Sequence, residues 1–527
     1  MKIMRLFDSM RGSSAVGVRP TIHQGQYTAG ETTGGLSVLF TMLCIVDLFG
    51  VFPVVALPKS VIACGLYGIP LVIAVFSLQL YTAVLLGKSW LLAYELSPNI
   101  REKTPSIRIL FGITFPYAAV AELAFGDNAR RLVTFFIDAT VFGAAVPNFI
   151  FASQSLQLFW WKISGGSVGV TYCVWMVVIG LLLCPIMWLG SPKDMKSLAL
   201  TSVCIVGTVA VATWYCILTD DESPSSLGGV LDYTPEIGDF LTAYGIIAFQ
   251  FDIHPMLLTL QVDMKDSRRI NAAVLAAFLT TGLVFLITTV LAANRYGDSV
   301  ESNILQGIPP SITLYIVALL VTLQLCLSSA VGNSALFQHL EDLLKIPRNF
   351  CIQRCLMRSS IVALAVFLGE SVPRFDLVMG LVGSTLTGPL MFIFPPLFFL
   401  KLCYLKSINI KQEFSMSYKP KVSVSERNAS LQDGVDLSKL PLVSNESLPN
   451  KYQTFGSYEE IYRAYIDEYN VKWYDVLLAF LVMLLGMTAT VVATYSSWSD
   501  AISSATFSPP CLLNASAAAR SFIQDTS

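Results

Sequence analysis

Two short stretches of the sequence place a carboxyl group beside a helix-breaking proline inside a long apolar segment. Residues 248–255 read AFQFDIHP, with Asp252 and His254 directly before Pro255, and residues 47–53 read DLFGVFP. Proline removes a backbone donor and clashes with the preceding turn, so each stretch is expected to unwind or kink. The freed backbone N–H groups could bind an anion and the freed carbonyls a cation.

Five polar residues are the candidates for binding or proton transfer, and each has a structural alternative. In LLVTLQLC, the oxygens of Thr322 and Gln324 could bind an ion near the first apolar segment, or could link helices. Asp47 and Asp252 could bind a ligand or exchange a proton, or could instead cap the broken helices. His254 could relay a proton, or could hold the proline turn in place.

The composition indicates that these residues are held by membrane helices. Of 527 residues, 54% are hydrophobic and 13% are charged. Soluble domains average about 25% charged residues, so this share is low. The apolar residues come in blocks of roughly 20, the length that crosses a hydrocarbon core of ~30 Å. We therefore expect an all-α multi-pass protein in the lipid bilayer, and the net charge of −2 gives no indication of nucleic-acid binding.

Eleven apolar segments define the expected spans and domains. They cover roughly residues 36–57, 66–86, 132–158, 168–189, 198–218, 240–260, 272–293, 312–336, 359–368, 377–400 and 476–495. The expected domains are a cytosolic N-terminal segment (1–33), a ten-helix core (34–404), a partly disordered cytosolic linker (405–473), an eleventh helix (474–496) and an outward tail (497–527).

The distribution of Lys and Arg predicts the orientation. With a cytosolic N-terminus and eleven spans, the cytosolic segments hold 29 of the 34 basic residues, and without the long linker the ratio is still 19 to 5. Cytosolic segments of membrane proteins are enriched in these residues, so we expect an extracellular or lumenal C-terminus. Asn514, in LNAS of the outward tail, should then carry a glycan. Asn428 and Asn445 match the same pattern but lie in the linker.

Other functional classes find little support. No Ser-His-Asp spacing, metal-ligand cluster or phosphate-binding loop is present, so neither an enzyme nor a metal or cofactor is expected. The eleven cysteines are scattered, mostly in apolar segments, and are interpreted as buried small hydrophobic residues. The first twenty residues contain no continuous apolar run of the signal-peptide type.

The two interruptions fall in the first and sixth segments. Five helices repeated with inverted topology would produce this spacing, because an odd number of helices flips the second copy. Transporters of that kind bind substrate near the midplane, at their broken helices. Two ordinary proline kinks are the alternative. The acids at both breaks favour the repeat, because an aspartate at mid-bilayer costs at least ~2.5 kcal/mol unless it is functional or paired.

Both breaks resemble the amino acid/auxin permease family. The stretch VFPVVALPKSVIACG resembles the family opening G-x-G-x-L-x-L-P-x-A-x-x-x-x-G, with Leu57, Pro58 and Gly65 at the family spacing. YGIIAFQFDIHPMLLTLQVDMK is similar to its F-x-F-x-x-H-P…D-M-K segment, and MGLVGSTLTGPLMFIFPPLFFLKL to its tenth helix. The family includes proton-coupled and sodium-coupled neutral amino acid transporters, and vesicular and vacuolar amino acid transporters.

The resemblance implies a five-plus-five inverted-repeat fold of eleven helices with helices 1 and 6 broken. The function implied is secondary active transport of amino acids by alternating access. We expect small or medium neutral substrates, because the proposed pocket has aromatic walls and no Lys or Arg for a second carboxylate. The implied substrate-binding residues are Val51, Phe52, Val54, Phe249, Phe251 and Asp252, and the implied ion-coupling residues are Asp47, His254, Thr322 and Gln324.

Departures from the family pattern affect the coupling ion. Asp47 stands where sodium-coupled members carry an asparagine, so we expect a proton as the coupling ion, with sodium as the alternative. Val51 and Pro53 stand where the family usually has glycines, so the first break should have its own local shape. An amino acid sensor that signals through the 405–473 linker is a second functional hypothesis. The membrane is the plasma membrane or a lysosomal or vesicular membrane.

Overall fold

The computed structural model describes residues 35–97, 115–164, 170–188, 195–220, 234–347, 350–372, 374–417 and 473–504. In these ranges all regular elements are helices, apart from an isolated parallel bridge between Leu36 and Met264. The chain divides into two compact units. The described helices belong to the unit made of Thr32–Lys406 and Val471–Ser527, except that α18 runs on past Lys406.

The helices follow the predicted segments closely. Their bounds are α1 Val38–Phe49, α2 Phe52–Val55, α3 Leu57–Ile62, α4 Gly68–Leu96, α6 Pro116–Phe125, α7 Asp127–Ile163, α8 Tyr172–Trp188, α9 Met195–Leu218, α11 Ile237–Gln250, α12 His254–Asp263, α13 Ile270–Tyr296, α14 Ile304–Gly307, α15 Ile312–Leu343, α16 Ile352–Ser371, α17 Phe375–Val382, α18 Phe394–Ser417 and α21 Trp473–Ser504. Three short 3₁₀ turns, η2 Gly65–Tyr67, η3 Ser267–Arg269 and η4 Gly297–Ser299, and two π-helical stretches, η5 Gly383–Thr387 and η6 Pro389–Ile393, connect them.

Each predicted segment overlaps one or more of these helices. Within the described ranges, nine helices are long and apolar enough to cross a membrane, judged by length and composition. The other two predicted segments contain shorter apolar helices, α1 of 12 residues and α8 of 17 residues. The prediction of an all-α multi-pass membrane protein is therefore confirmed. Helix α6 lies in a connecting segment where no helix was expected, and α18 continues through Ser417, past the expected domain boundary at residue 404.

Both predicted helix breaks are present, and their prolines begin new helices. Helix α1 ends at Gly50, whose φ of 60° and ψ of −149° define a conformation that only glycine adopts readily. Pro53 and Pro255 lie in the first turns of α2 and α12, where the missing N–H is one that a helix start leaves unbonded anyway. The first break is short, because the chain coils again from Phe52.

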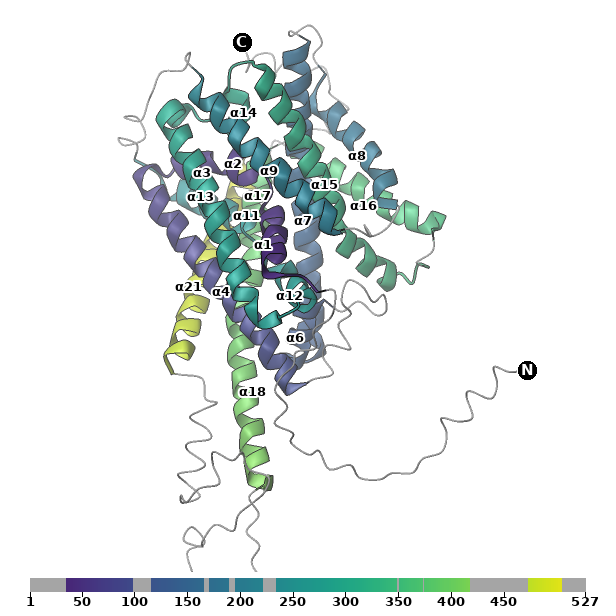
Figure 1. Cartoon of the computed structure of the whole chain (residues 1–527), viewed down its shortest axis with the longest axis vertical. Coiled ribbons are helices and arrows are strands. Elements are labelled where there is room, and N and C mark those ends of the chain that lie inside the picture. Colours follow the sequence, from purple (N-terminus) through teal and green to yellow (C-terminus); the bar gives the residue numbers. More distant parts are fainter. Residues whose placement is uncertain are drawn as a thin grey trace, which may run out of the picture. The chain divides into compact units, whose positions relative to one another are not determined.

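The broken spans lie inside the bundle (Figure 1). Helix α1 packs against α13 and α9, and α11 packs against α4, α17 and α21. Helix α15 runs along α7, while α8 and α16 pack together on the side away from α21 (Figure 1). Helix α11 crosses α17 and η5 through glycines. A Cβ atom on Gly383 would lie 1.9 Å from the carbonyl oxygen of Gly245, so only the missing side chains permit this approach.

One cysteine differs from the sequence interpretation. Nine of the cysteines in the described ranges are free, as expected. Cys173, in the first turn of α8, is disulfide-bonded, and its partner lies outside the described residues. Cysteine pairing of this kind cannot be read from the spacing alone.

Candidate functional site

The two helix breaks lie side by side. The side-chain amide of Gln250, the last residue of α11, donates a hydrogen bond to the backbone carbonyl of Phe49, the last residue of α1. The rings of Phe49 and Phe251 also meet edge to face, with centroids 5.1 Å apart. A carbonyl at a helix end needs a partner when it is buried, and Gln250 supplies one. The C-terminal ends of α1 and α11 are therefore held together at the two breaks.

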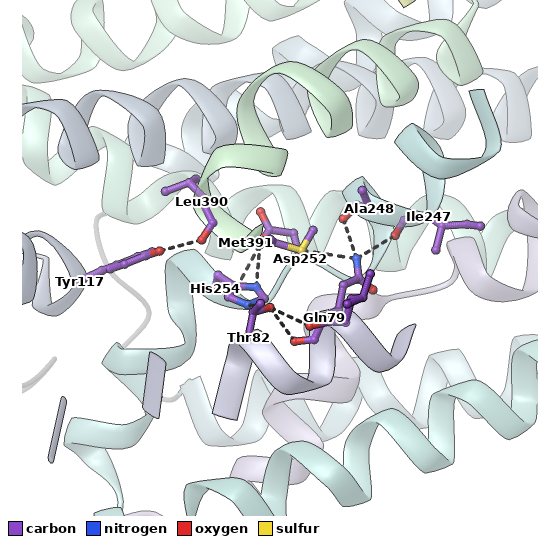
Figure 2. Close-up of polar contacts among 10 residues, drawn as sticks. Gln79, Thr82, Tyr117, Ile247, Ala248, Asp252, His254, Leu390 and Met391 are labelled. Carbon is purple, nitrogen blue, oxygen red and sulfur yellow. Dashed lines mark hydrogen bonds and ion pairs between the residues drawn. The ribbon is translucent and has the colours of Figure 1, made fainter. Parts of the chain in front are cut away.

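The second break is also held from α4, as Figure 2 shows. Gln79 Nε2 lies 3.4 Å from the carbonyl oxygen of Ile247 and 3.3 Å from that of Ala248, and donates to both. These carbonyls belong to the last turn of α11, which the break leaves without the next helical turn. The same amide lies 3.4 Å from the sulfur of Met391 in η6. Gln79 is fully buried, so its role is to satisfy the broken helix end.

Asp252 and His254 form a buried pair at the start of α12 (Figure 2). The backbone N–H of His254 donates to Asp252 Oδ1 at 3.1 Å, and His254 Nδ1 lies 3.5 Å from the same oxygen. On its other side, His254 Nε2 lies 3.1 Å from the hydroxyl of Thr82. Thr387 of η5 faces the Asp252 carboxylate. Asp252, one residue before the N-cap Ile253, therefore accepts the first N–H of α12, and His254 links this start of the helix to α4.

The predicted aromatic walls have different surroundings. Phe251 is completely buried, with its ring centroid 4.8 Å from that of Phe76 and 6.2 Å from that of Phe285. Phe249 is partly exposed and lies against Gly383 of η5. Phe249 is thus the one of the two whose ring borders a less tightly packed space. The predicted substrate residues of the first break, Val51, Phe52 and Val54, are buried at the start of α2.

Asp47 and Gln324 lie on either side of one serine. The hydroxyl of Ser202 in α9 hydrogen-bonds the Asp47 carboxylate, and Gln324 Nε2 lies 3.4 Å from Ser202 Oγ. A Cβ atom on Gly50 would lie 3.0 Å from Gln324 Nε2, so α15 also touches the first break. Asp47 Oδ1 and Gln324 Oε1 are buried and have no hydrogen-bond partner among the residues that the structure describes. Three side chains with oxygen atoms thus converge from α1, α9 and α15.

Thr322 lies apart from this group. Its hydroxyl donates to the carbonyl of Ala318 at 2.9 Å and lies 3.3 Å from that of Ala152 in α7. Residues two apart on a helix do not share a face, so Thr322 and Gln324 point to different neighbours. Of the four predicted ion-coupling residues, Asp47 and Gln324 come together, His254 lies at the other break, and Thr322 faces α7.

A pocket of about 240 Å³ opens at the end of the bundle beyond the breaks. Its walls come from α3, α11 and the start of α17. Ala56, which joins α2 to α3, and Ile246 of α11 lie in this lining, so the pocket reaches the outer side of both broken spans.

Several important polar residues were missed by the sequence reading. They are Gln79, Thr82, Ser202 and Gln250, all buried. The available signal was an uncharged polar residue inside an apolar segment, which in Gln250 stood within the stretch AFQFDIHP itself. Such residues more often link helices than bind ligands, and here Gln79 and Gln250 do link helices.

Comparisons with known proteins identify the family of this chain. A profile of the family described as "Transmembrane amino acid transporter protein" matches residues 37–419. The chain is 24% identical over 360 residues to amino acid transporter AVT1H of Arabidopsis thaliana, covering 66% of this chain and 78% of that protein. It is 24% identical over 293 residues to AVT1B of the same plant, covering 54% of this chain and 53% of AVT1B. The chain thus spans about half the length of AVT1B.

The crystal structure of MhsT in complex with L-phenylalanine aligns with a TM-score of 0.49 at 11% identity, covering 88% of this chain and 99% of that chain.

Proposed function

The chain belongs to the transmembrane amino acid transporter family, and on that premise we propose that it carries small or medium neutral amino acids by proton-coupled secondary active transport. The observation that carries the proposal is the junction of the two helix breaks, where Gln250 bonds the carbonyl of Phe49. Broken helices that meet inside a bundle place helix ends, with their backbone N–H and C=O groups, in a region otherwise closed to water, where a zwitterion can bind. Alternating access would proceed around this junction.

The substrate would lie at the breaks. Its α-carboxylate would bind backbone N–H groups at the first break, near Val51, Phe52 and Val54, where α1 has ended at Gly50. Asp252 contributes negative charge toward the ammonium group, and Phe249 and Phe251 border the side chain. No Lys or Arg occurs in residues 47–57 or 247–256. A second carboxylate would lack a cationic partner there, so a neutral substrate is favoured.

The coupling site would be the group of Asp47, Ser202 and Gln324. An aspartate can take up and release a proton during the cycle, and the unbonded Oδ1 of Asp47 is an available acceptor. His254, bonded to Thr82, would assist at the second break, and Thr322 would support α15 from its α7 side. The same oxygen atoms could hold sodium, so the ion is the first point that the experiment must decide.

We further propose the topology indicated by the basic residues. The N-terminus and the 405–473 linker would lie in the cytosol, and the C-terminal tail outside or in a lumen. Five predicted apolar segments precede the broken sixth segment, and the two broken spans at equivalent positions support an inverted repeat. The membrane would be the plasma membrane or a lysosomal or vesicular membrane. The alternative function is an amino acid sensor that keeps the same site and signals through its linker.

Reconstitution into liposomes tests the proposal. Purified protein would be supplied with a panel of labelled amino acids, under separately imposed proton and sodium gradients. We expect concentrative uptake of neutral amino acids driven by the proton gradient. Glutamate uptake that neutral amino acids do not inhibit would contradict the substrate assignment. Binding of amino acids without any flux would favour the sensor.

A further inference from the structure

The pocket beyond the breaks is lined by charged and hydroxyl side chains. It lies between α3 and α11, the two halves of the broken spans on that side, and the start of α17. Its volume is about 240 Å³. This is space for one small organic molecule, below the range of about 300–1,000 Å³ that is typical of pockets for drug-sized ligands.

Charges of both signs line this pocket. Lys59 projects from α3 and Arg374 from the N-cap of α17, while Asp239 and Asp376 come from the first turns of α11 and α17. The Arg374 guanidinium lies 3.1 Å from the Asp376 carboxylate. The Arg374 side chain is 57% exposed, so this ion pair is weak and open to exchange with a ligand. The two positive and two negative groups cancel in formal charge.

Hydroxyl groups complete the lining. Ser60, Thr242 and Ser302 contribute donors and acceptors from α3, α11 and the segment before α14. Apolar contact comes from Ala63 and Ile246. Small ligand sites commonly combine such an apolar floor with a few placed polar groups. The whole set differs from the central break, where Lys and Arg are missing from the sequence.

We propose that this pocket is a second, outer site that binds one free zwitterionic amino acid before it reaches the breaks. The inference rests on the proposed transport function for the identity of the ligand. A zwitterion carries one carboxylate and one ammonium group and no net charge, so it matches walls of two cations and two anions. Its carboxylate binds between Lys59 and Arg374, and its ammonium group binds beside Asp239 or Asp376.

The outer site would also select neutral over charged amino acids. Amino acids with a charged side chain add one charge that has no counterpart among walls whose own formal charges already cancel. The outer site therefore favours neutral amino acids before the central site is reached. In the proposed topology, Lys59 and Arg374 lie on the extracellular or lumenal side, so the outer site would act on amino acids that enter from that side.

A cysteine placed in the lining tests binding directly. Ser302→Cys, in purified protein in liposomes, would be labelled with a membrane-impermeant, positively charged methanethiosulfonate, with the parent protein measuring background from native cysteines. We expect alanine to slow labelling in a saturable way. Combining Ser302→Cys with Lys59→Met and Arg374→Gln should raise the half-protecting concentration of alanine at least tenfold. The control is Arg131→Gln, whose side chain is 72% exposed and pairs with Asp127 at the start of α7.

Transport kinetics give a second measurement. Without Ser302→Cys, the Lys59→Met, Arg374→Gln variant should raise the KM for alanine severalfold while the maximal rate changes less than about twofold, because the lost contacts precede the transport step. Lys59→Glu should weaken competition by glutamate and strengthen competition by lysine. Equal half-protecting concentrations in all variants, or alanine that never protects position 302, would overturn the outer site.

The two proposals fail in distinguishable ways. If parent liposomes take up no amino acid yet alanine protects position 302, the outer site stands and the transport function is wrong. If uptake is normal and protection is absent, transport stands and the outer site is wrong. Elution as a single monodisperse peak on size exclusion, compared with Arg131→Gln, shows that each variant is folded.

Discussion

The side-chain amide of Gln250 donates to the backbone carbonyl of Phe49, and so joins the last turn of α11 to the last turn of α1. Each break leaves buried backbone groups that no helix can satisfy. Gln79 holds two more carbonyls of α11 from α4. The breaks are therefore stable because side chains from other helices replace the missing helical hydrogen bonds. Since Gln250 joins the two breaks, we expect a displacement of one break to displace the other.

Replacing Gln250 should lower the thermal stability of the protein. Gln250→Met keeps a side chain of similar length but removes the amide, which leaves the Phe49 carbonyl buried without its partner. A buried unsatisfied group costs about 1–3 kcal/mol. Thermal unfolding of the purified protein should show a lower Tm. Thr280→Val is the control, because its exposed hydroxyl bonds only the carbonyl of its own helix. Equal Tm values for both variants would contradict this.

The glycine crossing of α11 with η5 should tolerate no side chain. Gly383→Ala would place a Cβ atom 1.9 Å from the carbonyl oxygen of Gly245 and 2.8 Å from Cβ of Phe249, so backbone must move. We expect a large loss of folded protein, measured as the monodisperse fraction on size exclusion. Gly207→Ala in α9 is the matched control, because no atom lies within 4 Å of its Cβ position. Equal yields of the two variants would show that the crossing is looser than described.

Asp47→Asn should remove the pH dependence of transport. The amide can keep the hydrogen bond with Ser202 but cannot carry an exchangeable proton. If Asp47 is the coupling group, uptake by the parent protein rises as the external medium is acidified, and the variant loses that rise. Its concentrative uptake should fall at least tenfold while exchange persists. Asp127→Asn, at the start of α7, is the control. Parent uptake that follows a sodium gradient and ignores pH would contradict proton coupling.

Two substitutions separate the role of Asp252 as a hydrogen-bond acceptor from its role as a negative charge. Asp252→Asn retains an oxygen that accepts the N–H of His254, whereas Asp252→Ala removes it. A buried N–H left without its acceptor costs about 1–3 kcal/mol, so only the alanine variant should have a clearly lower Tm. If the charge also attracts the substrate ammonium group, both variants raise the KM for neutral amino acids. An asparagine variant with unchanged KM would leave Asp252 a structural role alone.

Glycan mapping tests the orientation. Expressed in eukaryotic cells, the protein should carry a glycan at Asn514, and Asn514→Gln should remove one glycan-sized shift on a gel. Asn514, Asn428 and Asn445 all lie outside the described residues. Sugar on Asn428 or Asn445 would place the linker on the lumenal side and overturn the expected topology.

The sequence alone was sufficient for the helical class, the positions of the apolar segments and the two breaks. Each of these properties is local. A run of about 20 apolar residues predicts a span wherever it occurs, and Gly50, Pro53 and Pro255 act on their own backbone. The family resemblance was likewise carried by contiguous motifs around residues 51–65 and 249–265. The family profile later matched residues 37–419, in agreement with it.

Only the tertiary structure decided which polar groups meet. Ser202 lies between Asp47 and Gln324, and Thr322 faces α7, although Thr322 and Gln324 are neighbours in sequence. Helices that are apolar on all sides have no amphipathic stripe to indicate which face turns inward. In a membrane, the rotation of each helix about its own axis is set by close packing at small residues such as Gly383 and by polar contacts between distant segments. Those pairings belong to the folded chain, and no local pattern in the sequence encodes them.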